Sequence, residues 1–436
     1  MKFLINLKFL ILKLDWNKWL WVVWLLLVPT QLGKHFWPEW SLVAGVRVDY
    51  LSPTLYLGDI IWVLLVIFNL KFVRLRRTSL RFEIIKLIKS RKFWVGVVLV
   101  VINILVAGNR WEAIYRWIRI GQVLISLKFI KFKVYQVRWY LLWIIPIWIV
   151  VESWLGLAQV VNGGSLGGIW WWLGERRFAL GGIGLAEWQV AGENIIRAYG
   201  TFSHPNSLAG FLLVSLIYWL GIYESRNLGI KNFYKWTVLW SGVLGIVLSG
   251  SRVVWGVGII ILIISNFQFL ISKKNINLRK IIGYLGVGSG VIILILGLIS
   301  INYRVGDFVG GWDRNSIDKR LELARQAGAM IKLNPLFGVG AGNFLVAQPR
   351  FEIEGQGRWR QPVHNIFLLW LSEMGIIITI YIIHKLQTYK FQTNFKKQFP
   401  NYKLVIMGVI AITGMVDHYW LTLPQNWWLL AIMLAV

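Results

Sequence analysis

Cysteine is absent from the 436 residues, which excludes disulfides, thiol catalysis and thiolate metal sites. Acidic residues are scarce, because 19 Asp and Glu stand against 47 Lys and Arg, for a formal net charge of +28. The chain also lacks an H-E-x-x-H pattern and an Asp-x-Asp pattern, both of which are typical of metal sites. We therefore predict that the protein requires no metal and no other cofactor.

Polar residues are too few to cover a soluble core, since 57% of the chain is hydrophobic and the mean hydropathy is +0.60. Apolar windows of roughly 16 to 22 residues recur, and each can cross a ~30 Å hydrocarbon layer as a helix. We count about twelve such windows: 17–33, 51–70, 93–108, 111–129, 138–160, 205–222, 236–250, 252–270, 281–301, 362–384, 404–417 and 421–436. The sequence thus predicts an all-α polytopic integral membrane protein in which residues 1–436 form one membrane domain.

Positive charge follows a one-sided pattern along the predicted spans. The N-terminal segment and every second link are rich in Lys and Arg, and the only acids on that side are Asp15, Glu83 and Glu224. The positive-inside rule then places both termini in the cytoplasm of a multi-pass protein of the inner or plasma membrane. Because the charge reports topology and not a nucleic-acid groove, we predict a lipid bilayer as a partner and no nucleic acid.

Two predicted external links are long, about 162–204 and 302–361, and most residues of chemical interest fall in or beside them. The second link contains SIDKRLELARQAGAMIKLNP, which predicts an amphipathic helix that starts at Ser316 and stops at Asn334-Pro335. Its expected apolar face consists of Ile317, Leu321, Ala324 and Ile331. Such a helix lies on the membrane surface or covers a cavity. The glycine-rich GVGAGNF that follows comes after no strand, so it does not indicate a nucleotide site.

The first long link ends in RAYGTFSHPNSLAGFLL, residues 197–213. A Pro-Asn pair before an apolar run suits the start of a helix, which accounts for His204, Pro205 and Asn206 without any functional role. Arg197 is not explained in this way. On the external face it gains little from the anionic cytoplasmic surface, so an anionic substrate is the better partner.

Three further arginines lie near the predicted external boundary. Arg252 occupies a short external hairpin, and Arg116 and Arg119 are three residues apart on one helix face. Charges inside a membrane are candidates for function by default, although a structural ion pair is the competing interpretation, with Asp59 as a possible partner. The planar fork of arginine suits bidentate binding of a lipid-linked phosphate or pyrophosphate.

A candidate acid or base lies in QPVHNIFLLWLSEMGI, where His364 stands at the external mouth of the tenth span. Histidine titrates near neutral pH and can take a proton from an attacking hydroxyl. Glu373 follows nine residues later, about 13 Å along a helix. The competing interpretations are a helix-terminal histidine bound to backbone and a buried structural carboxylate. His418, beside Asp417 in the last external link, is a weaker candidate.

These segments resemble a known family. RAYGTFSHPNSLAGFLL, LSGSRVVWG, DKRLELARQAGAMIKLNPLFGVGAGNF, VHNIFLLWLSEMGI and DHYWLTLPQ are similar to the successive motifs of the O-antigen ligase and polymerase superfamily, over about residues 197–424. The resemblance implies a helical fold of the GT-C kind. It also implies inverting transfer of a glycan from an undecaprenyl-pyrophosphate carrier to an acceptor hydroxyl at the external, periplasmic face, without metal or nucleotide.

The resemblance also implies individual roles. Arg197 and Arg252 match arginines that hold the pyrophosphate, and His364 matches a histidine that activates the acceptor. We add Arg116 and Arg119 as pyrophosphate-binding candidates from the reasoning above. Supporting roles fall to His204, Asn206, Asn365, Glu373 and Asp59.

Three products share this chemistry and these motifs, because the acceptor can be a lipid, a glycan or a protein. The enzyme is accordingly a ligase, a polymerase or a protein O-oligosaccharyltransferase. A transporter of bicarbonate or another small solute is the alternative from a different class. It would favour inverted repeats and polar breaks at the bilayer midplane, whereas the polar cluster here is predicted to be external.

Overall fold

The computed structural model describes residues 15–43, 45–72, 85–86, 88–182, 184–190, 193–226, 232–271, 314–352, 360–391 and 401–436. The predicted span at 281–301 and parts of the predicted link at 302–361 lie outside these residues, as do the first basic residues of the chain.

Every predicted span within the described residues contains a helix. The long helices are α2 (Trp16–Leu26), α3 (Leu57–Phe72), α5 (Arg91–Val106), α6 (Arg110–Phe132), α7 (Val134–Asn162), α9 (Pro205–Arg226), α10 (Asn232–Ser249), α11 (Arg252–Ile271), α16 (Ile366–Phe391), α18 (Asn401–Gly414) and α20 (Pro424–Ala435). Three apolar stretches are long enough to cross a membrane, namely all of α7, residues 205–223 of α9 and residues 366–385 of α16. Shorter apolar helices occupy residues 57–69, 233–249, 252–261 and 402–414.

Helix α9 is the centre of the main bundle. Of its most apolar window, 94% is buried, and α7, α10, α11, α18 and α20 all contact it. Leu208, Phe211, Leu212 and Trp219 are completely buried on it. Because α9 is enclosed on all sides, the residues at its first turn are held in fixed positions relative to α7 and α18.

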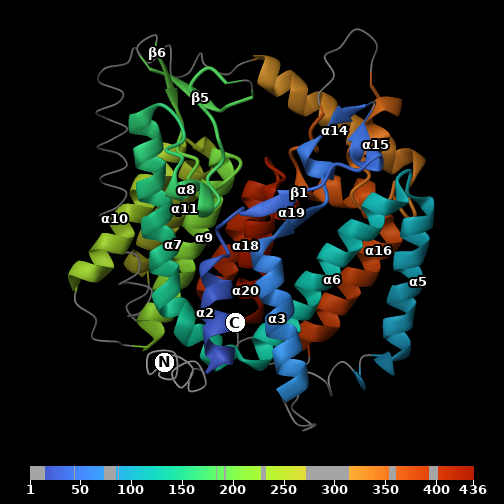
Figure 1. Cartoon of the computed structure of the whole chain (residues 1–436), viewed down its shortest axis with the longest axis horizontal. Helices are drawn as coiled ribbons and strands as arrows, with labels where there is room; N and C mark the ends of the chain where they lie inside the picture. Colours follow the sequence, from blue (N-terminus) through green and yellow to red (C-terminus); the bar gives the residue numbers. More distant parts are fainter. Residues whose placement is uncertain are drawn as a thin grey trace, which may run out of the picture.

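Short elements lie in the upper half of Figure 1. They include three antiparallel strand pairs, the short helices and the amphipathic helix: β1 (Gly33–His35) with β4 (Thr54–Tyr56), β2 (Leu42–Val43) with β3 (Val46–Arg47), β5 (Glu187–Val190) with β6 (Glu193–Ile196), α8 (Ile169–Trp172), α14 (Arg314–Leu333), α15 (Phe344–Ala347) and α19 (Tyr419–Thr422). The all-α prediction did not include these strands. It also overlooked the ordered segment at 33–56, which pairs its backbone groups in two of the three sheets.

Helix α14 confirms the predicted amphipathic helix and its stop, since it ends at Leu333 directly before Asn334. Its predicted apolar face is partly right, because Ala324 packs against the buried cluster, and wrong at Leu321. Leu323, Ala327 and Met330 are completely buried against α15 and α16, whereas Leu321 is 64% exposed. The periodicity of an amphipathic helix fixes its stripe only to within neighbouring positions, and the partner elements decide which residues are covered.

Helix α16 is broken at Gly375, where the backbone has φ 68° and ψ 178°. Residues 335–340 enter this break. Their N–H groups donate to carbonyls before Gly375, and their carbonyls accept from N–H groups after it, at 2.8 to 3.1 Å. Irregular backbone at membrane depth is tolerated only where other protein groups satisfy it. The start of the glycine-rich segment therefore supplies the backbone hydrogen bonds that the broken helix lacks.

Asn103 of α5 joins both sides of this junction. Its Nδ2 donates to the carbonyls of Phe337 (2.8 Å) and Glu373 (3.0 Å), and its Oδ1 accepts from the N–H of Ala341 (2.9 Å) and the indole of Trp117 (2.8 Å). Every donor and acceptor of the buried amide is thus used. The junction carries Glu373 to a defined place on the inner side of α16.

Candidate functional site

The loop before α9 is held by two polar side chains of α7. Gln159 Oε1 accepts from the N–H of Gly200 at 2.8 Å and of Tyr199 at 3.2 Å, and Glu152 accepts from the N–H of Thr201 at 2.8 Å. Gly200 has φ +58°, and a Cβ there would overlap with the Glu152 carboxylate. The AYGT motif is therefore a turn that requires glycine and is fixed to the core of the bundle.

Arg197 stands at the entrance of this loop and begins a chain of polar contacts. Its Nε donates to the carbonyl of Ser249 at 2.6 Å, and a terminal nitrogen donates to Asn206 Oδ1 at 2.7 Å. Asn206 Nδ2 then donates to Asp417 Oδ2 at 2.9 Å. Burial lowers the pKa of Arg197 to about 10, so the guanidinium stays charged at neutral pH.

Asp417 is the centre of a cluster with three histidines. Its Oδ1 accepts from the N–H of His418 at 2.8 Å and lies 3.7 Å from Nδ1 of His364, whose ring is 5.0 Å from that of His418. Burial would raise the pKa of Asp417, but the imidazole of His364 and the other histidines outweigh this effect and hold the pKa below its usual range. The carboxylate is therefore ionised.

Burial has the opposite consequence for two of the imidazoles, because it disfavours their charged form. It lowers the pKa of His418 to about 3 and that of His204 to about 4, although the charge of Asp417 opposes both shifts. Both rings are neutral at neutral pH. His364 differs from them in being partly exposed, with 19% of its side-chain surface accessible.

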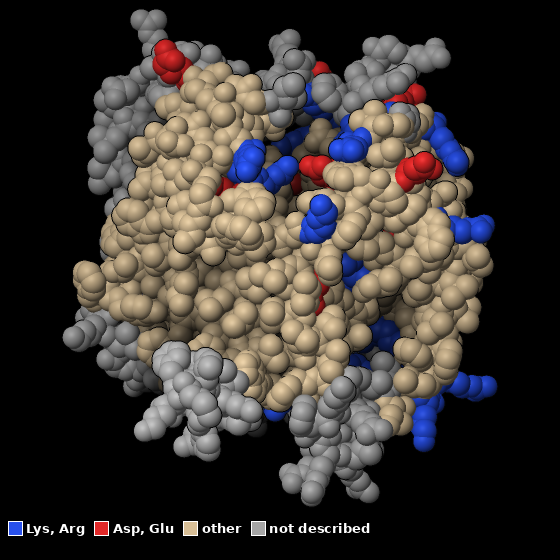
Figure 2. All heavy atoms as spheres, in the orientation of Figure 1, with Lys and Arg blue, Asp and Glu red and all other residues tan. Residues whose placement is uncertain are grey.

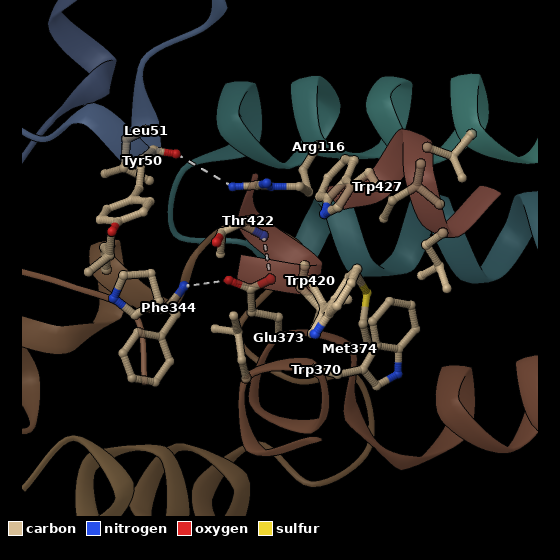
Figure 3. A pocket seen from close by; sticks show the side chains of 18 of the residues that line it. Tyr50, Leu51, Arg116, Phe344, Trp370, Glu373, Met374, Trp420, Thr422 and Trp427 are labelled. Carbon is tan, nitrogen blue, oxygen red and sulfur yellow. Dashed lines mark hydrogen bonds between the residues drawn. The ribbon is translucent and has the colours of Figure 1, made fainter. Parts of the chain in front are cut away.

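A cavity of about 170 Å³ adjoins this cluster between α6, α16 and α20 (Figure 3). Most of its wall is apolar or aromatic, including Trp370, Trp420 and Trp427, whereas Arg116 and Glu373 are polar members of the wall. The Arg116 guanidinium lies 5.5 Å from the ring of Trp427, donates to the carbonyl of Tyr50 at 3.5 Å and is 3.6 Å from Glu112. The cavity thus combines an apolar wall with one cation.

Glu373 is held by the glycine-rich loop. Its carboxylate accepts from the N–H of Gly342 at 3.0 Å and of Phe344 at 3.3 Å, as the dashed lines in Figure 3 show. Gly342 has φ +70°, which favours glycine. The loop therefore binds a carboxylate of its own chain through backbone donors.

The cavity and the histidine cluster lie next to each other. Tyr50 and Thr422 line the cavity, and both contact His418, Tyr50 edge-on at 5.4 Å between ring centroids and Thr422 through a 2.8 Å hydrogen bond. Figure 2 shows Lys, Arg, Asp and Glu side chains around a hollow in the upper part of the molecule, above a broad band of other residues. Polar and apolar surfaces therefore meet at the end of the bundle that carries the strands.

The structure brings most of the sequence-predicted residues together and separates others. Arg197, His204, Asn206 and His364 surround Asp417, while Arg116 and Glu373 lie in the adjoining cavity. Arg252 begins α11, is exposed and has no ion-pair partner among the described residues. Its charge acts on Arg197.

Arg119, Asp59 and Asn365 have structural contacts instead. Arg119 forms a buried ion pair with Asp59 at 2.7 Å, supported by Gln122, as the competing interpretation proposed. Asn365 caps α16 by accepting from the N–H of Phe367 and Leu368 at 2.9 and 3.0 Å.

Sequence reasoning missed Asp417 and Tyr50 as site residues. Asp417 was noted only as the neighbour of His418, although a lone acid after an apolar span, within the DHYWLTLPQ motif, was a usable signal. Tyr50 gave no such signal, because it reaches the site through the segment at 33–56, whose fold the composition does not reveal.

Comparison with known families gives one match. Residues 237–383 match a family described as O-antigen ligase, which confirms the resemblance drawn from the motifs. The matched range contains Arg252, the glycine-rich junction and His364, whereas Arg197 and Asp417 lie outside it. No curated protein matches the chain.

Proposed function

We propose that this protein, which carries an O-antigen ligase domain, is a membrane glycosyltransferase. It moves a glycan from an undecaprenyl-pyrophosphate carrier to an acceptor hydroxyl at the external face. The observation that carries the proposal is the convergence of Arg197, Asp417 and His364 beside His418, which contacts Tyr50 and Thr422 in the wall of an apolar cavity. Such a site suits a substrate with an anionic head and a lipid tail.

The donor's charged head would meet the arginines. Arg197 is fixed through Ser249 and Asn206, and exposed Arg252 adds a second positive charge near it. Arg116 adds a third in the cavity, whose apolar wall suits the first part of the carrier's hydrocarbon chain. Arg119 has no part in this proposal, because it does not line the cavity and its guanidinium is buried in a 2.7 Å ion pair with Asp59.

His364 would act as the general base. An ionised carboxylate beside its Nδ1 stabilises the imidazolium that forms when Nε2 takes the acceptor's proton. The acceptor oxygen then bonds to the anomeric carbon as the bond from that carbon to the pyrophosphate oxygen breaks, which inverts the configuration. Arginines placed in advance stabilise the negative charge that grows on the leaving pyrophosphate.

The position of the cluster supports a transferase over a transporter. Among the described residues, Asp417 and its histidines lie in links at the end of the bundle. A transport site for a small solute is expected near the bilayer midplane. Ligase, polymerase and protein O-oligosaccharyltransferase activities all remain within the proposal, since they differ only in the acceptor.

The test uses purified protein in detergent with an undecaprenyl-pyrophosphate-linked oligosaccharide, alone and with lipid, glycan or peptide acceptors. Carrier release and product size are followed together. A product ladder from donor alone identifies a polymerase, and one transfer that requires an added acceptor identifies a ligase or a protein glycosyltransferase. No carrier release with any acceptor would contradict the proposal and favour solute transport.

A further inference from the structure

His364, Asp417 and His418 form a compact group with metal-ligand chemistry. Each offers one nitrogen or oxygen atom, and these three atoms lie within 4.8 Å of one another. The segments that carry these residues are hydrogen-bonded to each other, because Asn365, next to His364, donates to the carbonyl of Met415 at 3.1 Å. Two separate segments are therefore fixed against each other at this point.

The hydrogen bonds of His418 decide which of its nitrogens is free. Thr422 Oγ1 donates its proton to the carbonyl of His418 at 3.1 Å, so its oxygen accepts from Nδ1–H of the ring at 2.8 Å. This contact leaves the lone pair on Nε2. A ligating histidine is typically oriented in this way by a partner on its other nitrogen.

The side chains of His364 and Asp417 are also oriented for coordination. Nδ1 of His364 is buried, has no hydrogen-bond partner in the part of the chain that the structure describes and lies 3.7 Å from Asp417 Oδ1. The carboxylate is oriented by Asn206 at one oxygen and by the N–H of His418 at the other. Two imidazoles and one carboxylate suit Zn²⁺ and similar transition ions, whereas Mg²⁺ and Ca²⁺ prefer oxygen ligands alone.

We propose that His364, Asp417 and His418 bind one divalent transition ion of the Zn²⁺ class, and that this ion inhibits the protein. Coordination uses the lone pair of neutral His364 and leaves its only proton on the opposite nitrogen. The ring then cannot accept a proton from an acceptor hydroxyl. Inhibition rests on the proposed function, whereas binding of the ion does not.

Binding is tested without turnover, on the full chain in detergent. Wild-type protein is titrated with Co²⁺, whose visible absorption reports nitrogen and oxygen coordination, and with Zn²⁺ in equilibrium dialysis. We expect one ion per chain and no competition from Mg²⁺. His418→Ala and Asp417→Asn should each weaken binding about tenfold or more, while His384→Ala, at an exposed histidine near the far end of α16, should not.

Melting curves without metal show whether each variant is folded, and Asp417→Asn serves if His418→Ala does not fold. Absence of saturable Zn²⁺ binding, or equal binding by wild type and both ligand variants, would overturn the site. Zn²⁺ should also slow carrier release by the wild type more than by His418→Ala, each relative to its own metal-free rate. Zn²⁺ binding without any transferase activity would refute the proposed function and leave the metal site standing.

Discussion

Arg197 and Arg252, the two arginines expected to bind the donor, differ in their own contacts within the protein. Arg197 uses its planar fork on Ser249 and Asn206, whereas exposed Arg252 has no ion-pair partner among the described residues. Arg197→Lys removes the fork and keeps the charge, so we expect carrier release to fall about tenfold or more. Arg252→Lys should cost less than about threefold, because a point charge suffices there.

The comparison requires both variants to be folded and inserted, which their melting curves in detergent establish. Equal losses in the two lysine variants would mean that the geometry of Arg197 is unimportant. Wild-type rates in both alanine variants would remove arginines from the mechanism altogether.

Helix α16 depends on a glycine at its break. Gly375 occupies a backbone region that is essentially restricted to glycine, and a Cβ there would overlap with the carbonyl of Leu336. We expect Gly375→Ala to lower the free energy of unfolding by about 3 kcal/mol or more. The matched control is Gly408→Ala in α18. A Cβ there meets no atom of the described residues within 4 Å, so the alanine should stabilise the helix by about 0.5 to 1 kcal/mol. Similar melting temperatures for both variants would contradict the tight junction.

Helix α14 offers a second contrast between its faces. Met330 is completely buried against the cluster that includes α15 and α16, whereas Leu321 is 64% exposed. Met330→Ala should therefore destabilise the protein by about 2 to 5 kcal/mol, and Leu321→Ala should change stability by no more than about 0.5 kcal/mol. Thermal unfolding in detergent distinguishes the two, and the reverse order would restore the face predicted from sequence.

The positions of the long helices could be predicted from the sequence, because they depend only on the length of the apolar windows. Helices occupy each predicted span within the described residues, because long apolar windows have few other stable structures in lipid. The break in α16, the strands at 33–56 and the buried face of α14 depend on contacts between distant segments. Asn103, for example, is one polar residue in an apolar span of the sequence, and its role follows only from its hydrogen bonds to the carbonyls of Phe337 and Glu373.

The whole molecule has two different ends. Strands β5 and β6 and helix α14 lie at the top of Figure 1, and α5 begins at the bottom. The chain has no cysteine, so single cysteines can report which end is external. An impermeant thiol reagent should label Glu193→Cys in intact cells, and Lys89→Cys only after permeabilisation, because both positions are exposed at opposite ends. Labelling in the reverse pattern would contradict the proposed orientation.

The sequence predicted several residues of the candidate site but not how the fold brings them together. His364 and Arg197 stood out in the sequence because polar residues at the edge of a membrane span need a reason. Asp417, the residue that joins them, is 53 positions from His364 and 220 from Arg197, so only the packing of α9, α16 and α18 brings the three together. Arg119 shows the opposite case, in which an intramembrane charge has a structural partner.

The most direct test of the central claim is carrier release from a lipid-linked oligosaccharide by wild type, His364→Ala and His384→Ala. Both substituted residues lie at or in α16, which makes the second variant a matched control. We predict that His364→Ala loses transfer by about 100-fold or more and still binds the donor, while His384→Ala retains the wild-type rate. Equal release by all three proteins would contradict acceptor activation by His364 and, with it, the proposed mechanism.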